Sequence, residues 1–230
     1  HRYMKFGTLI LFVLALSSAT AQTLFPRFGI TGTTNSQKAD YTDINSGAGF
    51  TAGAGYSQQI TELFSVQLEI NYMQKAFSSV YENSFSQNVG TDTYSVNEYI
   101  KSDYRLSYLE MPFLAKFTYK KLFITAGPYG AYGLGGSYKY ERNTTSSYLG
   151  TTQESSSSNI KFGSKAHPTG NDFYFDNKLD IGFNAGLGIV LFEKLIMECR
   201  YARGSNLRDA GESRNHTLQL TAAWAFHLTN

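Results

Sequence analysis

The sequence contains one cysteine, four prolines and four histidines among its 230 residues. A single cysteine, Cys199, excludes an intrachain disulfide framework. No apolar run after residue 21 reaches the roughly 20 residues that a membrane-spanning helix needs. The histidines have no metal-ligand spacing and the chain has no glycine-rich phosphate loop, so we expect neither a metal nor a cofactor.

The first 21 residues have the composition of a cleaved signal peptide. Met4 and Lys5 give a positive start, residues 9–16 are apolar, and an A-x-A pattern ends at Ala21. We predict cleavage before Gln22, which leaves residues 22–230 as one domain. Because the leader carries two of the 20 basic residues, 18 remain against 18 acidic ones. This balance gives no reason to expect a nucleic-acid partner.

Apolar residues recur at every second position in four segments, the longest of which runs from residue 179 to residue 191. A period of two is typical of strands with one apolar and one polar face. Extending the pattern predicts eight strands, most of them long enough to cross a membrane when tilted. The predicted strands are 25–34, 48–59, 63–77, 104–119, 122–141, 178–192, 195–204 and 215–228.

Short and long connections alternate strictly between these strands. An up-and-down barrel therefore places all short turns at one rim and all long loops at the other, as in outer-membrane barrels. The fold predicted is an all-β, eight-stranded antiparallel transmembrane barrel in the outer membrane of a Gram-negative bacterium, with both termini periplasmic. A soluble lipocalin-like barrel, with the apolar parity inside, is the alternative.

Aromatic residues gather near the predicted strand ends, as expected of girdles at the two membrane interfaces. The girdle predicted consists of Tyr72, Tyr104, Tyr119, Tyr201, Trp224 and Phe226.

Several ordered blocks resemble the PorT-type outer-membrane β-barrel family. Residues 104–119 (YRLSYLEMPFLAKFTY) and 122–132 (LFITAGPYGAY) are similar to its Y-L-E-(I/M)-P and A-G-P blocks. Residues 64–75 and 195–203 resemble two further strands of that family. The resemblance implies an eight-stranded barrel with outward loops and implies no reaction. For some relatives it implies a role in assembly or secretion.

The polar parity of the strands contains charged residues that would be costly in lipid, so we expect them to face the lumen. Because unpaired buried charges are unfavourable, we predict that they form ion pairs and fill the interior. The predicted network consists of Glu69, Arg105, Glu110, Lys116, Glu198 and Arg200. The turn at 192–194 should set Glu198 and Arg200 opposite Gly188 and Gly186.

The apolar parity changes inside the strand predicted at 104–119. Leu106 and Tyr108 occupy one parity, whereas Leu109 and Met111 occupy the other. We predict a bulge near 108–111, and a strand kink at Pro112 with Pro128 close to it on the next strand.

The function predicted is that of a non-enzymatic envelope protein, either structural or binding an extracellular partner through residues 78–103 and 142–177. In the first of these loops, strands three and four are expected to continue as a hairpin, whereas residues 142–170 are expected to be flexible. A narrow pore for small solutes and an accessory role in envelope assembly or secretion are the alternatives. A lipid-modifying enzyme would need His216 to meet a hydroxyl and a carboxylate, such as those of Ser213 and Glu212.

Overall fold

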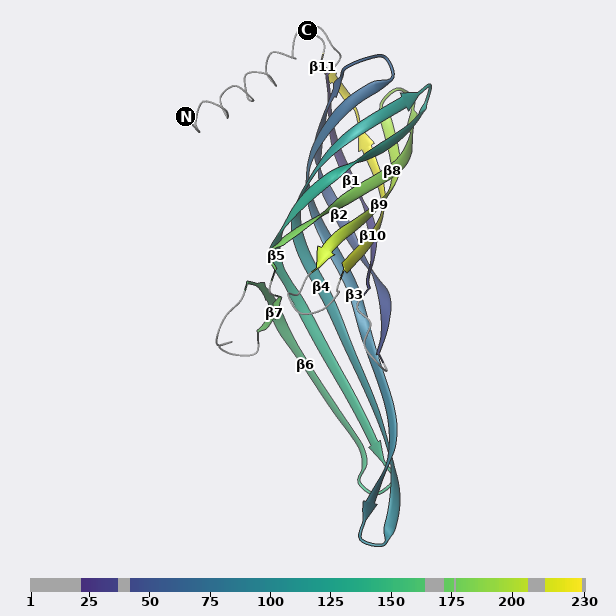
Figure 1. The fold of residues 1–230 in the computed structure, drawn as a ribbon, viewed down its shortest axis with the longest axis vertical. Helices are drawn as coiled ribbons and strands as arrows, with labels where there is room; N and C mark the ends of the chain where they lie inside the picture. Colours follow the sequence, from purple (N-terminus) through teal and green to yellow (C-terminus); the bar gives the residue numbers. More distant parts are fainter. Residues whose placement is uncertain (1–21, 37–41, 164–171, 176, 207–213, 229–230) are drawn as a thin grey trace.

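The computed structural model describes residues 22–36, 42–163, 172–175, 177–206 and 214–228. Its eleven strands form one sheet, and eight of them close into a ring in the order β1-β2-β3-β4-β5-β8-β9-β10 (Figure 1). All neighbours in the ring are antiparallel. Within the described ranges, no helix is long and apolar enough to cross a membrane.

Each ring strand overlaps one of the eight predicted strands, although the third and fourth extend 12 residues beyond their predicted ends. The remaining three strands attach to the ring. The bounds are β1 Gln22–Asn35, β2 Thr42–Gln59, β3 Phe64–Val89, β4 Asp92–Tyr119, β5 Leu122–Ser146, β6 Gly150–Phe162, β7 Phe173–Phe175, β8 Leu179–Leu191, β9 Leu195–Asn206, β10 Arg214–Trp224 and β11 Phe226–Leu228. β6 pairs with β5, β7 pairs with β6, and β11 continues β10 along β1. The predicted eight-stranded barrel is confirmed.

Three short connections lie at the end of the barrel where β1 begins and β11 ends, and we call this end the turn end. Lys120, Phe192 and Glu193 adopt positive φ angles there, which lets two or three residues reverse the chain. The opposite end, from which the long connections start, is called the long-loop end.

Side chains alternate between the lumen and the outer surface as a period of two requires. In β8, Leu179, Ile181 and Phe183 are more than half exposed, whereas Asp180 and Asn184 are buried. Exposed apolar side chains cover the outside of the ring, and buried polar side chains fill much of the inside. This arrangement is the reverse of a soluble barrel and matches a membrane barrel.

β3, β4, β5 and β6 continue far beyond the long-loop end as a sheet (Figure 1). We call residues 78–89, 92–103, 137–146 and 150–160 the projecting sheet. The predicted extension of strands three and four as a hairpin is confirmed. The expectation of a flexible segment over residues 142–170 is wrong for 142–162, which form a hairpin; residues 164–171 lie outside the described part.

A bulge does occur at the edge of the predicted range 108–111, because the register of β4 against β5 shifts between Ser107 and Tyr108, but β4 itself does not change parity. Leu106, Tyr108 and Glu110 all point into the lumen and are fully buried. The irregularity lies in the neighbouring strand, because Ser107 pairs with Gly135 and Tyr108 pairs with Gly133, which leaves one extra residue in β5. A parity change follows from the sequence only if every apolar residue faces lipid, whereas apolar side chains also fill the lumen near the long-loop end.

Two predicted positions change as a consequence of this correction. Arg105 lies on the outward parity of β4 and is exposed, so it is not a lumen residue. Tyr104 lies on the inward parity and stacks on Phe77 with ring centroids 4.9 Å apart. Tyr104 therefore belongs to the interior of the long-loop end and not to the outer girdle.

Candidate functional site

The lumen is the place where buried charge is concentrated. Among the described residues, the buried charged side chains are Arg27, Glu69, Lys75, Glu110, Lys116, Asp180, Glu198 and Arg200. Four are cations and four are carboxylates, so the interior is balanced. A balanced interior has no excess charge of one sign that would favour the passage of one kind of ion.

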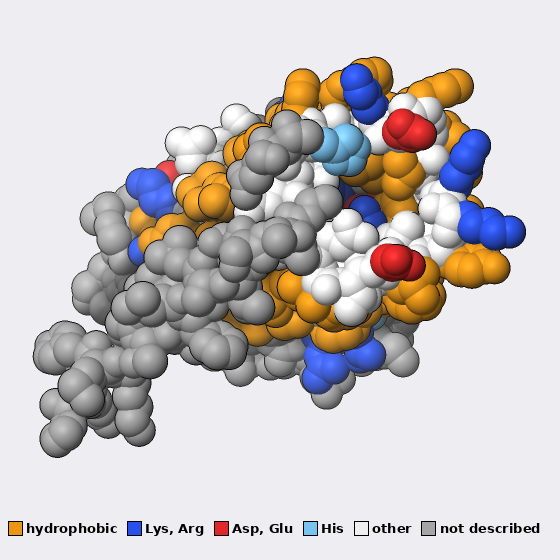
Figure 2. Space-filling model, turned by 90° about the horizontal axis from the view of Figure 1, so that it is seen from above, with side chains coloured by type: hydrophobic (Ala, Val, Ile, Leu, Met, Phe, Trp, Pro, Cys, Tyr) orange, Lys and Arg blue, Asp and Glu red, His pale blue; other side chains and the backbone are white. Residues whose placement is uncertain are grey.

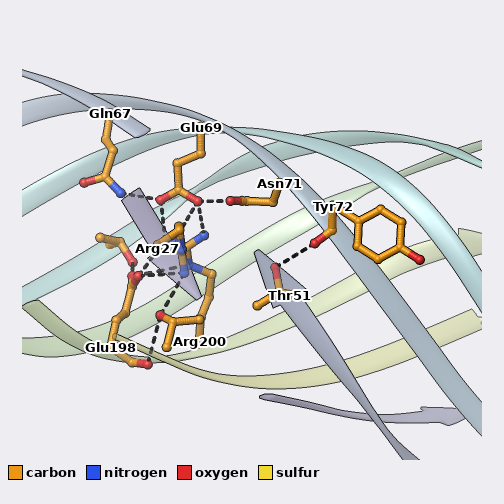
Figure 3. Close-up of polar contacts among 10 residues, drawn as sticks. Arg27, Thr51, Gln67, Glu69, Asn71, Tyr72, Glu198 and Arg200 are labelled. Atoms are coloured by element: carbon orange, nitrogen blue, oxygen red, sulfur yellow. Dashed lines mark hydrogen bonds and ion pairs between the residues drawn. The ribbon is translucent and has the colours of Figure 1, made fainter. Parts of the chain in front are cut away.

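Arg200 is the centre of an ion-pair cluster that joins β3 to β9. Its guanidinium donates two hydrogen bonds of 2.9 Å to the carboxylate of Glu69. It donates two more, of 2.7 and 3.2 Å, to the carboxylate of Glu198 (Figure 3). Paired bonds of this kind fix both the distance and the orientation of the two groups. Gly186 and Gly188 lie opposite Arg200 and Glu198, as predicted, and leave space for the long side chains.

Arg27 adds a third strand, β1, to the cluster. It forms ion pairs with Glu69 and, at 3.4 Å, with Glu198. It also donates a 2.9 Å hydrogen bond to the hydroxyl of Thr221 on β10. Further donors to the two carboxylates are Gln67, Asn71 and Thr125. The carboxylates are thus surrounded by donors from several wall strands, which satisfies the main requirement for burying charge.

A second ion pair lies nearer the long-loop end. Lys75 on β3 and Asp180 on β8 are 2.7 Å apart, and both side chains are almost fully buried. The ammonium group also lies 4.9 Å from the ring centre of Tyr108 and 5.3 Å from that of Tyr129. This pair links opposite walls across the lumen.

Two of the residues predicted for the network lie in the lumen without an ion pair. Both carboxylate oxygens of Glu110 are buried and accept no hydrogen bond from the described residues. Lys116 lies 4.2 Å from the ring centre of Phe123 and is within 4.0 Å of no described carboxylate. Of the six residues predicted, the structure brings together Glu69, Glu198 and Arg200.

An apolar layer closes the lumen near the turn end. It consists of Phe25, Phe123, Ile196, Ala223 and Ala225, with Val190 packed against it. A hollow of about 180 Å³ lies between this layer and the turns (Figure 2). Residues of this layer, together with Lys116, line the inner end of the hollow. A small cavity of about 10 Å³ lies beyond it, between the layer and the ion-pair cluster.

An aromatic cap closes the lumen near the long-loop end. Tyr108 and Tyr129 from the wall, with Phe77, Leu106 and Ala202, pack against Phe175 and Ile160. Phe162 and Phe173 cover this cluster, so three rings enter from β6 and β7, which lie outside the ring. We use the name aromatic cap for Phe162, Phe173 and Phe175.

The predicted girdle and kink residues are distributed as follows. Tyr119, Trp224 and Phe226 are exposed near the turn end, and Tyr72 and Tyr201 point outward nearer the long-loop end. Their role at the membrane interfaces stays a prediction.

Pro112 lies opposite Tyr129, and Pro128 lies opposite Phe183 on β8. Backbone pairing of β4 with β3 and with β5 is interrupted beside both prolines. The register of these strand pairs nevertheless stays the same on either side of the interruption. A kink at these two positions stays a prediction.

The residues considered for catalysis are not assembled in the described part of the chain. His216 lies on the outward face, with its Nδ1 2.5 Å from the hydroxyl oxygen of Tyr201. Ser213 and Glu212 lie outside the described residues. No group of three His, Cys, Asp or Glu side chains that could hold a metal occurs among the residues described.

Three residues that form lumen ion pairs, Arg27, Lys75 and Asp180, are not in the predicted network. Arg27 occupies the polar parity beside Phe28 and Ile30, and Lys75 continues the parity of Glu69. Asp180 lies between the apolar Leu179 and Ile181, on the polar parity of its strand. Their parity could have identified Arg27 and Lys75, whereas the pairing of Lys75 with Asp180 depends on the closure of the ring.

The sequence matches the family described as "Outer membrane protein beta-barrel domain" over residues 21–208, which is more than half of the chain. The chain belongs to this family. It is therefore an outer-membrane β-barrel protein, and its exposed apolar belt is in contact with membrane lipid. The more specific PorT-type resemblance stays a prediction.

No curated protein is significantly similar in sequence. The solved structures that are similar include Ail, the attachment invasion locus protein of Yersinia pestis, with 15% identity, a TM-score of 0.43, and coverage of 90% of this chain and 100% of Ail. Neisserial surface protein A has 10% identity, a TM-score of 0.36, and coverage of 88% and 97%. OprG from Pseudomonas aeruginosa has 11% identity, a TM-score of 0.35, and coverage of 91% and 98%. Likeness at this level gives no information on ligands or partners.

Proposed function

We propose that this outer-membrane barrel is a non-enzymatic binding protein that presents its projecting sheet to an extracellular partner above a closed lumen. The turn end and both termini face the periplasm in this proposal, because short turns are periplasmic in barrels of this class. Residues 1–21, which lie outside the described part, are proposed to be a cleaved signal peptide.

The lumen supports a closed barrel and argues against the alternative of a narrow pore. Ion pairs, an apolar layer and the aromatic cap occupy successive levels between the two ends. An ion would have to displace hydrogen-bonded charges and then pass two apolar layers. The interior is therefore best explained as a structural plug.

The free edge of β6 is the observation that carries the binding proposal. Residues 150–159 pair with β5, and among the described residues nothing pairs with their other side. The segment reads GTTQESSSSN and contains one charge, Glu154, and no proline. Exposed edges are usually protected by lysine or proline, and an unprotected edge can accept a strand from a partner.

The opposite edge of the projecting sheet offers a second place for a strand. β3 residues 82–89 pair with β4, whereas the pairing of β3 with β2 ends at Tyr81 and Thr42. The two free edges lie in the predicted binding ranges 78–103 and 142–177. Both edges are held beyond the membrane by the strands that build the barrel wall.

Adhesion of expressing cells tests this function. Cells displaying wild type should bind immobilised extracellular proteins, or each other, more strongly than cells displaying a variant shortened by residues 83–97 and 144–151. A second variant, Ser156→Pro, interrupts the β6 edge and leaves the barrel wall unchanged, so it should lose most of the same binding. Equal adhesion of all three, at equal surface levels, contradicts the proposal.

A further inference from the structure

A hollow of about 350 Å³ lies on the wall at β2–β5, where these strands leave the apolar belt. The register of β2 against β3 shifts beside it, between Gly47 and Thr51. The polar side chains that line it include Ser78, Lys101, Asp103, Arg105, Ser137 and Lys139. Three cations and one carboxylate give these residues a net charge of +2.

The position of this hollow relative to the membrane follows from the outward-facing residues of β4. From Phe117 to Leu109 the exposed positions are apolar, and beyond them come Ser107 and Arg105. From Phe117 to Leu109 the strand advances by eight residues, each of which adds about 3.3 Å. With the strand tilted by about 40° from the membrane normal, this segment spans roughly 20 Å of membrane. Arg105 lies four residues further, about 10 Å beyond the apolar stripe. This is the depth of lipid headgroups and not of hydrocarbon.

The cations are spaced to hold an anion between them. Arg105 lies directly opposite Ser137, and Lys139, two residues later on the same face, lies directly opposite Asp103. Diagonal neighbours of this kind are about 7–8 Å apart, a gap that a phosphate can bridge with charge-assisted hydrogen bonds. Asp103 lies 3.4 Å from Lys101, whereas Arg105 and Lys139 form no ion pair with any described residue.

The surroundings favour a lipid over a soluble anion. Immediately below the hollow, Phe50 and Tyr72 pack with ring centroids 5.4 Å apart on the outward face. Together with Leu109 they provide an apolar surface for acyl chains directly beneath the cations. A ligand that is phosphorylated at one end and apolar at the other fits both features.

We propose that this hollow binds the phosphorylated sugar headgroup of an outer-leaflet glycolipid, with Arg105 and Lys139 holding one phosphate. The serine hydroxyls and the Asp103 carboxylate are placed to meet sugar hydroxyls. The assignment to the outer leaflet rests on the proposed orientation, with the long loops outside, and is independent of what the projecting sheet binds.

Native mass spectrometry of the refolded full chain in detergent micelles tests this proposal. The probe is diphosphorylated lipid A, titrated against wild type and the Arg105→Gln/Lys139→Gln variant. Removal of two cations should weaken binding about 30-fold. Lys120→Gln/Lys121→Gln removes the same charge from the other end of the same hairpin and should bind like wild type. Circular dichroism verifies that all variants are folded.

Two further probes separate the sources of phosphate. Dephosphorylated lipid A should bind wild type as weakly as diphosphorylated lipid A binds the Arg105→Gln/Lys139→Gln variant. Millimolar glucosamine phosphate should not compete with lipid A, because it lacks acyl chains. Equal binding by wild type and that variant, or equal binding of both lipids, overturns the site. Full competition by glucosamine phosphate overturns the assignment to a lipid. None of these results depends on adhesion by the projecting sheet.

Discussion

In its middle the lumen is filled by ion pairs between wall strands, whereas toward the long-loop end it is filled by aromatic rings from a segment outside the ring. Arg27, Glu69, Glu198 and Arg200 each belong to a strand of the barrel, so their cluster cannot open without distorting the wall. Phe173 and Phe175 belong to β7, which pairs with the end of β6 alone. Loss of the ion-pair cluster should therefore destabilise the whole barrel, whereas loss of the aromatic cap should open the lumen only locally.

The largest effect is expected where a buried charge loses its partners. Glu69→Gln removes the carboxylate that binds Arg27 and Arg200, and leaves their guanidinium groups buried without it. The expected loss is about 3–5 kcal/mol in the free energy of unfolding. Urea unfolding of the refolded protein in lipid vesicles measures it.

Glu110→Gln is the matched control, because Glu110 is equally buried but has no hydrogen-bonded partner among the described residues. Removal of this unpaired carboxylate should leave the protein as stable as wild type or more stable. Equal losses for the two variants would show that the hydrogen-bonded cluster has no special part in stability.

A smaller effect is expected in the apolar layer near the turn end. A Cβ atom on Gly55 would lie 2.2 Å from the ring of Phe25, so Gly55→Ala should displace that ring. The expected loss is about 1–3 kcal/mol in the same unfolding experiment. Gly130→Ala is the control, since a Cβ atom there would have no neighbour within 4 Å in the part of the chain that the structure describes. A Gly55→Ala variant as stable as the control would indicate that this layer is loosely packed.

The smallest change in global stability is expected for the aromatic cap. Phe175→Ala should lower the free energy of unfolding by less than about 1 kcal/mol, because β7 can detach without opening the ring. Locally, the cap should open more often. Thiol labelling of Ala202→Cys, a buried position beneath the cap, should become at least about tenfold faster in a Cys199→Ala background. Unchanged labelling would mean that the cap is as fixed as the ion pairs.

The barrel itself was predictable because the alternation of apolar and polar residues in β8, β9 and β10 is a feature of the local sequence. It depends only on which face of each strand meets lipid. The alternation of short and long connections then determined the up-and-down order. The opposition of Gly186 to Arg200 followed from one tight turn. These features depend on neighbouring strands, so a single sequence carries them.

Features that depend on the closed ring were not predictable in the same way. The inward position of Leu106 and Tyr108 requires the aromatic cap, which comes from residues more than 50 positions away. Because the sequence around β4 does not show that cap, its apolar pattern places Arg105 and Tyr104 on the wrong faces. The pairing of Lys75 with Asp180 spans the lumen and is not a feature of either strand alone.

Single-channel conductance of the refolded protein in a planar bilayer tests most directly whether the lumen is closed. Wild type is predicted to carry no current. Phe25→Ala/Arg200→Ala/Phe175→Ala, which removes one large side chain from each closing level, is predicted to conduct and verifies that the assay detects an open barrel. A steady wild-type current would contradict the closed lumen and support the pore instead.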